Sequence, residues 1–140
     1  MIRGVLLDTG PVIALIDQRD QHHAWVASQF DEILPPLLTC EAVLTEACYL
    51  ARRIAGGTHA VLDLSARGVV RLDFDLDEHF APVSSLMERY ANVPMSLADA
   101  CLVRMAELAP HCVLFTQDRD FRIYRRHRRE KIPLLIPADA

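Results

Sequence analysis

The chain has 140 residues, 51% of them hydrophobic and 24% charged, which is the composition of one folded domain with its own core. The formal net charge of -4 at pH 7 argues against a protein that coats nucleic acid over its whole surface. No apolar run approaches the roughly 20 residues that span a bilayer, and the N-terminus lacks a signal-peptide pattern. We therefore expect a single domain over residues 1–140, located in the cytoplasm and not in a membrane.

Apolar segments of strand length and of helix length alternate along the chain. The first strand, at residues 5–7, stops at Asp8, and Pro11 stands at the first position of a helix that runs to residue 16. Further helices are expected at residues 22–34, 41–54, 58–67, 78–90 and 96–109. An apolar step at residues 37–38 and strands at 69–74, 112–115 and 134–136 lie between them. This alternation predicts an α/β fold with a mostly parallel sheet covered on both faces.

The helix at residues 41–54 is expected to begin after Thr39, a good N-cap residue, with Glu41 in its first turn. The helix at 78–90 contains Pro82, which a helix tolerates only in its first turn. The position of Pro82 therefore permits a start of this helix after residue 78.

Two acidic residues stand where apolar strands end. Asp8 follows the first strand, and Asp118 comes shortly after the strand at residues 112–115. Ligands of open α/β sheets gather outside the carboxyl ends of the strands, so both carboxylates are candidates for a site. The alternative for Asp118, and for Asp120 beside it, is a turn or a helix cap, because Asp is common in both places.

Glu46 interrupts an otherwise apolar helix face. The positions that share its face in the helix at residues 41–54 are Val43, Glu46, Ala47, Leu50 and Ile54. A carboxylate in such a stripe needs an explanation, because burying an uncompensated charge is costly.

Asp99 also lies on an apolar face, together with Leu102, Val103 and Ala106. The alternative for this residue is structural: Ser96 and Asp99 have the spacing of a capping box, in which Asp99 reaches back to the Ser96 amide. The sequence leaves both roles open.

Four carboxylates in a fold that gathers strand ends should repel one another and raise one another's pKa, unless a cation neutralises them. Hard oxygen ligands with room for water suit Mg²⁺ or Mn²⁺, whereas zinc prefers the nitrogen and sulfur ligands that show no pattern here. The residues thus indicate a Mg²⁺ or Mn²⁺ site for phosphate chemistry.

Four segments together resemble a PIN domain, and the size and element order are similar to the VapC toxins of bacterial toxin–antitoxin pairs. The segments are Leu6-Leu7-Asp8-Thr9-Gly10, Thr45-Glu46, Tyr90 to Ala100, and Phe115-Thr116-Gln117-Asp118-Arg119-Asp120-Phe121. The resemblance covers nearly the whole chain and implies a PIN-like three-layer α/β/α sandwich.

The resemblance implies that Asp8, Glu46, Asp99 and Asp118 form an acidic quartet that binds Mg²⁺ or Mn²⁺ and activates water to hydrolyse an RNA phosphodiester. Thr116 is implied as a supporting hydroxyl, with Thr9 and Asp120 as weaker candidates. Many relatives carry an acid in the loop before the helix at 96–109, where this chain has Asn92, so we leave that position out of the metal set. A cognate antitoxin and a homodimer are the implied protein partners.

Cationic residues concentrate in one segment, residues 119–131, which holds seven Arg and Lys residues against Asp120 and Glu130. One interpretation is a solvated surface helix or loop. The other is a phosphate-binding rim for RNA beside the acidic pocket, using Arg122, Arg125 and Arg126.

Other functions remain open at this point. A phosphoaspartyl phosphatase would need a second Asp two residues after Asp8, where Gly10 stands, and a receiver domain usually has a lysine at its site, whereas the only lysine here is Lys131. An RNA-processing nuclease outside a toxin–antitoxin pair, and a non-catalytic RNA-binding or partner-binding module, are the remaining alternatives.

Overall fold

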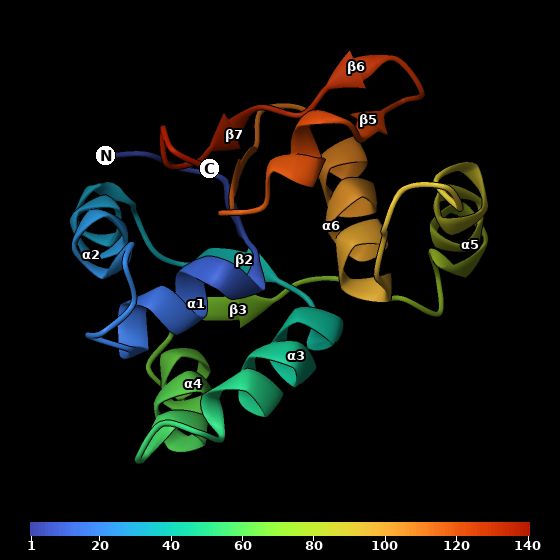
Figure 1. The fold of residues 1–140 in the computed structure, drawn as a ribbon. Helices are drawn as coiled ribbons and strands as arrows, with labels where there is room; N and C mark the ends of the chain where they lie inside the picture. The colour runs from blue at the N-terminus through green and yellow to red at the C-terminus, as the bar shows by residue number, and fades with distance from the viewer.

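The computed structural model describes all 140 residues as an α/β domain (Figure 1). The strands are β1 (Val5–Leu7), β2 (Leu37–Thr39), β3 (Val70–Leu72), β4 (Val113–Phe115), β5 (Arg125–Arg126), β6 (Glu130–Lys131) and β7 (Leu134–Leu135). The helices are α1 (Thr9–Ile16), α2 (His23–Glu32), α3 (Glu41–Ala51), α4 (Gly57–Ala66), α5 (Phe80–Arg89) and α6 (Leu97–Leu108), with a 3-10 turn, η1, at Arg119–Arg122. None of the helices combines the length and the apolar character that a membrane crossing requires.

The main sheet has five strands in the order β3-β2-β1-β4-β7, and every pairing in it is parallel. The predicted α/β fold with a mostly parallel sheet is therefore confirmed. In the register of the two central strands, Leu7 lies beside Phe115. The residues that follow, Asp8 and Thr116, consequently leave the sheet side by side at its carboxyl edge.

Side chains of β1 alternate between the two faces of the sheet, as strand geometry requires. Val5 and Leu7 belong to a core cluster with α1 to α4, whereas Leu6 belongs to a second cluster built mainly on α5 and α6. The result is the expected arrangement of helices, sheet and helices in three layers (Figure 1).

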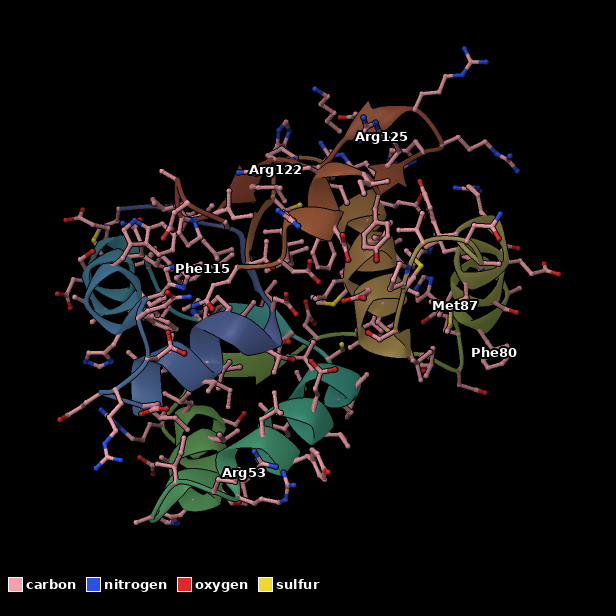
Figure 2. The ribbon with its side chains drawn as sticks, viewed as in Figure 1. Arg53, Phe80, Met87, Phe115, Arg122 and Arg125 are labelled. Atoms are coloured by element: carbon pink, nitrogen blue, oxygen red, sulfur yellow. The ribbon has the colours of Figure 1, made fainter.

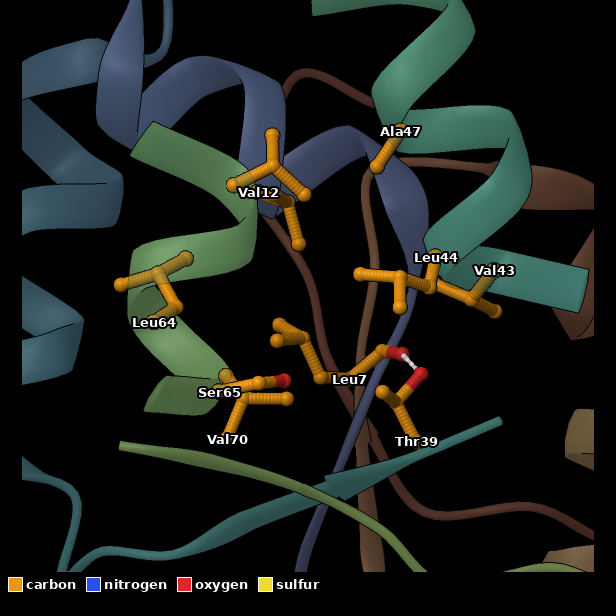
Figure 3. A pocket seen from close by; sticks show the side chains of 10 residues that line it. Leu7, Val12, Thr39, Val43, Leu44, Ala47, Leu64, Ser65 and Val70 are labelled. Carbon is orange, nitrogen blue, oxygen red and sulfur yellow. Dashed lines mark hydrogen bonds between the residues drawn. The ribbon is translucent and has the colours of Figure 1, made fainter. Parts of the chain in front are cut away.

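The first core cluster lies directly beneath the carboxyl edge of the sheet. A small void of about 10 Å³ lies there, lined mostly by apolar side chains of β1, β2, β3, α1, α3 and α4; Figure 3 shows most of the lining residues. Thr39 and Ser65 are its polar residues, and the Thr39 Oγ1 donates to the Leu7 carbonyl at 2.7 Å. Core packing thus holds the ends of β1 and β2 at fixed positions.

The structure corrects two predicted helix starts. Helix α1 begins at Thr9, because the Asp8 side chain accepts a hydrogen bond from the Thr9 amide and caps the helix. Pro11 is therefore the third helical residue, where its missing N–H removes nothing, since the first four amides have no partner in the helix. Thr39 lies in β2, and Cys40 is the N-cap residue of α3.

Other boundaries differ by a few residues. Helix α3 stops at Ala51 instead of residue 54, and β3 covers only Val70–Leu72. Helix α5 begins at Phe80, so that Pro82 falls in its first turn, as the sequence allowed.

The cationic segment contains a short 3-10 helix and a hairpin in place of the single surface helix or loop that was one interpretation. After the short turn η1, strands β5 and β6 form an antiparallel hairpin outside the main sheet, with Arg125 opposite Lys131 and Arg126 opposite Glu130. The sequence reasoning missed this hairpin because its strands have only two residues each and show no apolar alternation.

Candidate functional site

An open cleft of about 290 Å³ lies at the carboxyl edge of the sheet. Its lining residues are Asp8, Thr9, Gly10, Glu46, Leu50, Asp99, Gln117 and Asp118. All four carboxylates singled out by the sequence therefore face one cleft, although they come from four different segments of the chain.

Asp8 is the most buried of these acids, with 6% of its surface exposed. Its Oδ1 accepts from the Thr9 amide at 2.8 Å, and its Oδ2 accepts from the Thr116 hydroxyl at 2.6 Å. Burial raises the pKa of Asp8 to about 7, and the nearby charges of Asp99 and Asp118 act in the same direction, against the two hydrogen bonds. The carboxyl group is thus held rigidly, and its charge is unfavourable without a neutralising partner.

Thr116 connects two of the acids. Its Oγ1 donates to Asp8 and accepts from the backbone amide of Asp118 at 2.9 Å, and the residue is fully buried. One hydroxyl therefore fixes the carboxylate at the end of β1 relative to the turn after β4. The role of Thr116 as a supporting hydroxyl of a metal site stays a prediction.

Asp99 forms the capping box that the sequence allowed, and its side chain also faces the cleft. Its Oδ2 accepts from the Ser96 amide at 2.9 Å while the Ser96 hydroxyl accepts from the Asp99 amide at 3.0 Å, which completes a capping box at the start of α6. The same side chain lines the cleft. Burial raises its pKa, and the charges of Asp118 and Glu46 add to this effect.

Asp118 caps η1, because its Oδ1 accepts from the Asp120 amide at 2.9 Å. The cap predicted as an alternative for Asp118 is therefore present, and the residue lines the cleft as well. Asp120 does not line the cleft, and its side chain makes no hydrogen bond to the protein.

Glu46 lies at the exposed rim of the cleft, on α3, and accepts no hydrogen bond. With the side chains in these positions, no group of three or more His, Cys, Asp or Glu residues lies within joint reach of one metal ion. The four acids share a cleft, but they do not form a closed coordination shell.

Two polar atoms in this region lack a partner. The Oγ1 of Thr9 and the Nε2 of Gln117 are buried and make no hydrogen bond, and both residues line the cleft. Gln117 is a residue that the sequence reasoning missed, although it stands between Thr116 and Asp118. A side chain on Gly10 would lie 3.2 Å from the Gln117 Oε1, so glycine lets the two segments approach each other closely.

Tyr124 is a second residue that the sequence did not single out. It is fully buried, and its hydroxyl donates to the carbonyl of Pro94 in the loop before α6. Burial raises its pKa, and the charges of Asp99 and Asp120 contribute. The Tyr90 hydroxyl accepts from the Arg125 amide at 2.9 Å, so two tyrosines join the C-terminal segment to the loop that precedes Asp99.

The three arginines expected at an RNA-binding rim lie in different environments; Figure 2 labels two of them, Arg122 and Arg125. Arg122 is exposed, whereas Arg125 is half-buried and donates to carbonyls of its own segment. Arg126 is 4% exposed and donates to the Ala106 and Pro110 carbonyls at 3.1 Å. The expectation that Arg126 binds RNA is not compatible with this burial, because its guanidinium is used inside the protein.

Comparison with known proteins identifies the family. The model of the PIN domain matches residues 5–126, and no curated protein sequence matches the chain. Among solved structures, the VapC20 toxin of Mycobacterium tuberculosis, which cleaves the sarcin-ricin loop, is similar with a TM-score of 0.67 and 21% identity over 83% of this chain and 91% of the toxin. The VapBC2 structure from Rickettsia felis, bound to a DNA fragment from its promoter, is similar with a TM-score of 0.61 and 15% identity over 97% and 99%. At these identities the two structures support the fold alone, but the family match covers most of the chain, and the chain belongs to the PIN domain family.

Proposed function

We propose that this protein is a Mg²⁺- or Mn²⁺-dependent endoribonuclease that uses the acidic cleft as its active site. The observation that carries the proposal is the convergence of Asp8, Glu46, Asp99 and Asp118 on one cleft, where burial and mutual repulsion raise the pKa of Asp8 and of Asp99. Carboxylates kept in such an unfavourable environment are typical of functional sites.

The donor set fits a hard divalent cation. Only oxygen ligands are offered by the four acids, which suits Mg²⁺ or Mn²⁺ better than zinc. Asp8, Asp99 and Asp118 would hold the ion, directly or through water, and a small movement of the more exposed carboxylates would bring them into joint reach. A bound ion of this kind lowers the pKa of a coordinated water and offsets the negative charge that develops on the phosphate.

The residues of the chain position the groups around that ion. Thr116 orients the Asp8 carboxylate through its hydroxyl, and the Ser96 amide leaves only one Asp99 oxygen free to face the cleft. Glu46, at the open rim and without a hydrogen-bond partner, is placed to accept a hydrogen bond from the attacking water or to hold a second ion. The RNA phosphate enters from the open side, and no protein nucleophile is required.

We further propose that the nuclease is the toxin of a toxin–antitoxin pair and acts in the cytoplasm as a homodimer. This proposal is supported by the similarity to the VapC20 toxin and to the VapBC2 complex. The alternative is a PIN-fold nuclease for RNA processing. A neighbouring reading frame that encodes a short DNA-binding protein, able to inhibit cleavage after co-expression, would favour the toxin; its absence would favour the alternative.

The test is cleavage of several RNAs with Mg²⁺, with Mn²⁺ and with EDTA. We expect cleavage with either ion, none with EDTA, and a loss of about 100-fold or more in Asp99→Asn, since a single ligand contact is removed. The matched control is Asp31→Asn, which removes the same charge from an exposed position of α2 and should leave the rate unchanged. Cleavage that survives both EDTA and Asp99→Asn would contradict the proposal.

A further inference from the structure

The hairpin of β5 and β6 is rich in basic residues, and none of its residues lines the acidic cleft. It projects beyond the end of α6 that is remote from α3 (Figure 1). The PIN domain match ends at Arg126, within β5, so the turn of the hairpin and β6 lie beyond the matched residues.

The hairpin is anchored rigidly on α6. Arg126 lies under it, buried, with hydrogen bonds to the Ala106 and Pro110 carbonyls at the end of the helix and an ion pair to Glu130 at 2.8 Å. On the other side, the His127 amide donates to the Glu107 Oε2 at 2.8 Å. Both strands of the hairpin and its tip are therefore tied to one helix.

This anchoring separates the cations of the segment into two kinds. Arg126 binds the end of α6 and forms an ion pair with Glu130, the only acidic residue of the hairpin. The charge of Glu130 is therefore balanced by Arg126 and not by the exposed cations. Arg128, Arg129 and Lys131 are exposed and make no ion pair and no side-chain hydrogen bond. Arg128 and Arg129 lie in the turn and Lys131 lies in β6; these three unpaired cations are called the hairpin tip below.

The backbone at the tip is one that glycine would adopt more easily. His127 and Arg128 have φ angles of 50° and 71°, in the left-handed region, which is strained for residues with a side chain. Positive φ angles at consecutive residues are common in the turns that join hairpin strands, so this conformation belongs to the turn and does not show what the side chains bind.

Chain continuity connects the tip to the cleft. Asp118 lines the cleft, and η1 begins at the next residue with Arg119, followed by Arg122, both of them exposed. Exposed cations therefore accompany the chain from the acidic cleft to the hairpin. Asp99 of the cleft lies in the first turn of α6, whereas the hairpin is bonded near the end of that helix, so a polyanionic strand would have to extend along the length of α6 to contact both.

We propose that the hairpin tip, formed by Arg128, Arg129 and Lys131, binds the phosphodiester backbone of the RNA strand outside the cleft. The identification of that strand as RNA rests on the proposed function. Contacts of this type supply affinity and position the strand without reading its bases. The tip would compensate for the repulsion between the RNA and the acidic cleft.

The test is the salt dependence of binding to a single-stranded oligouridine of about 12 nucleotides, which spans a site of ordinary size. EDTA is present throughout. Each phosphate contact on a single strand contributes about 0.7 to the slope of log K against log salt. Arg128→Gln/Arg129→Gln should lower the slope by about 1.4 and weaken binding about 25-fold at ~0.1 M salt, if both contacts are lost.

The matched control is Arg52→Gln/Arg53→Gln, an exposed adjacent pair after α3. Arg53 lies far from Arg125 in the view of Figure 2. This variant should bind like the wild type, and Arg128→Lys/Arg129→Lys should keep the full slope. An unchanged slope in the hairpin variant, an equal loss in the control, or a loss seen only with duplex DNA of the same length would each overturn the proposal.

A glycine variant separates folding from binding. Arg128→Gly relieves the left-handed strain, so its Tm should be at or above that of the wild type while its slope falls by about 0.7. A binding loss accompanied by a lower Tm would count against a direct contact. EDTA prevents metal-dependent cleavage, so binding is measured separately from cleavage. If the protein cleaves no RNA but the salt slope depends on the hairpin, the proposed nuclease is rejected and the phosphodiester site is kept. If the protein cleaves RNA but the slope does not depend on the hairpin, the phosphodiester site is rejected and the proposed nuclease is kept.

Discussion

Asp8 supports the fold through its hydrogen bonds, but its buried negative charge is unfavourable for the stability of the fold. Its carboxyl group caps α1 and accepts from Thr116, yet burial raises its pKa to about 7. The folded protein therefore holds a proton at Asp8 more tightly than the unfolded chain does. It follows that the stabilisation is complete below the unfolded pKa of 3.8 and is lost as pH rises towards 7.

We predict that Asp8→Asn stabilises the metal-free protein at pH 8, by an amount on the order of 2 kcal/mol, and has no such effect at pH 4. Asparagine can still accept from the Thr9 amide, so the helix cap is retained. The measurement is urea unfolding in EDTA across this pH range. Equal effects at both pH values would show that the pKa of Asp8 is not raised by folding.

Helix α6 is the element on which fold and site depend most, because a capping box lies at its start and the hydrogen bonds of Arg126 lie at its end. At its start, Ser96 and Asp99 cap each other, and Asp99 also faces the cleft. At its end, Arg126 donates to the Ala106 carbonyl, one of those that the last turn leaves without a partner in the helix, and to the Pro110 carbonyl just beyond it.

Substitutions of the two capping-box residues should have different effects on stability and on cleavage. Ser96→Ala removes the acceptor for the Asp99 amide and is expected to cost about 1 kcal/mol of stability, with metal-dependent cleavage largely retained. Asp99→Asn keeps an oxygen for the Ser96 amide, so its stability in EDTA should be unchanged or higher while cleavage is lost. Unfolding and cleavage measured on the same two preparations decide this, and a parallel loss of both properties in both variants would contradict it.

At the other end, Arg126→Met keeps the apolar volume and removes the hydrogen bonds. It should cost about 2 to 3 kcal/mol, because buried carbonyls of α6 and Glu130 lose a charged donor. Arg129→Met, at an exposed position of the same hairpin, should stay within about 0.5 kcal/mol of the wild type. Thermal unfolding of the two variants gives the comparison, and equal costs would mean that Arg126 does not support the helix end.

On the scale of the whole molecule, the sequence predicted the fold class because it depends on patterns of burial. Apolar strands that end at Asp8 and Asp118, and Asp99 on an apolar helix face, are visible in the sequence. Glu46 also lines the cleft, but it is exposed, as is Leu50 on the same face of α3, so the predicted apolar stripe is not buried at these positions. The hairpin was not predictable, because its position depends on Arg126 being buried against the end of α6. In sequence, that arginine looks like its exposed neighbours.

The links between Thr116 and Asp8 and between Tyr124 and Pro94 were equally hidden, since their partners lie 108 and 30 residues apart. They depend on strand register and on the return of the C-terminal segment to the loop before α6. Such contacts tie the two ends of the chain to one cleft, so a ligand that draws the acids together should stabilise the entire fold.

Metal binding should consequently be visible as a rise in Tm. At a metal concentration about 100 times Kd, linkage gives about 2.7 kcal/mol, or a rise on the order of 10 °C for a domain of this size. Because Asp8 must lose its proton to ligate, the rise with Mn²⁺ should be larger at pH 8 than at pH 6. It should be absent in Asp8→Asn and intact in Asp31→Asn, and a rise that persists in Asp8→Asn would place the bound ion outside the acidic cleft.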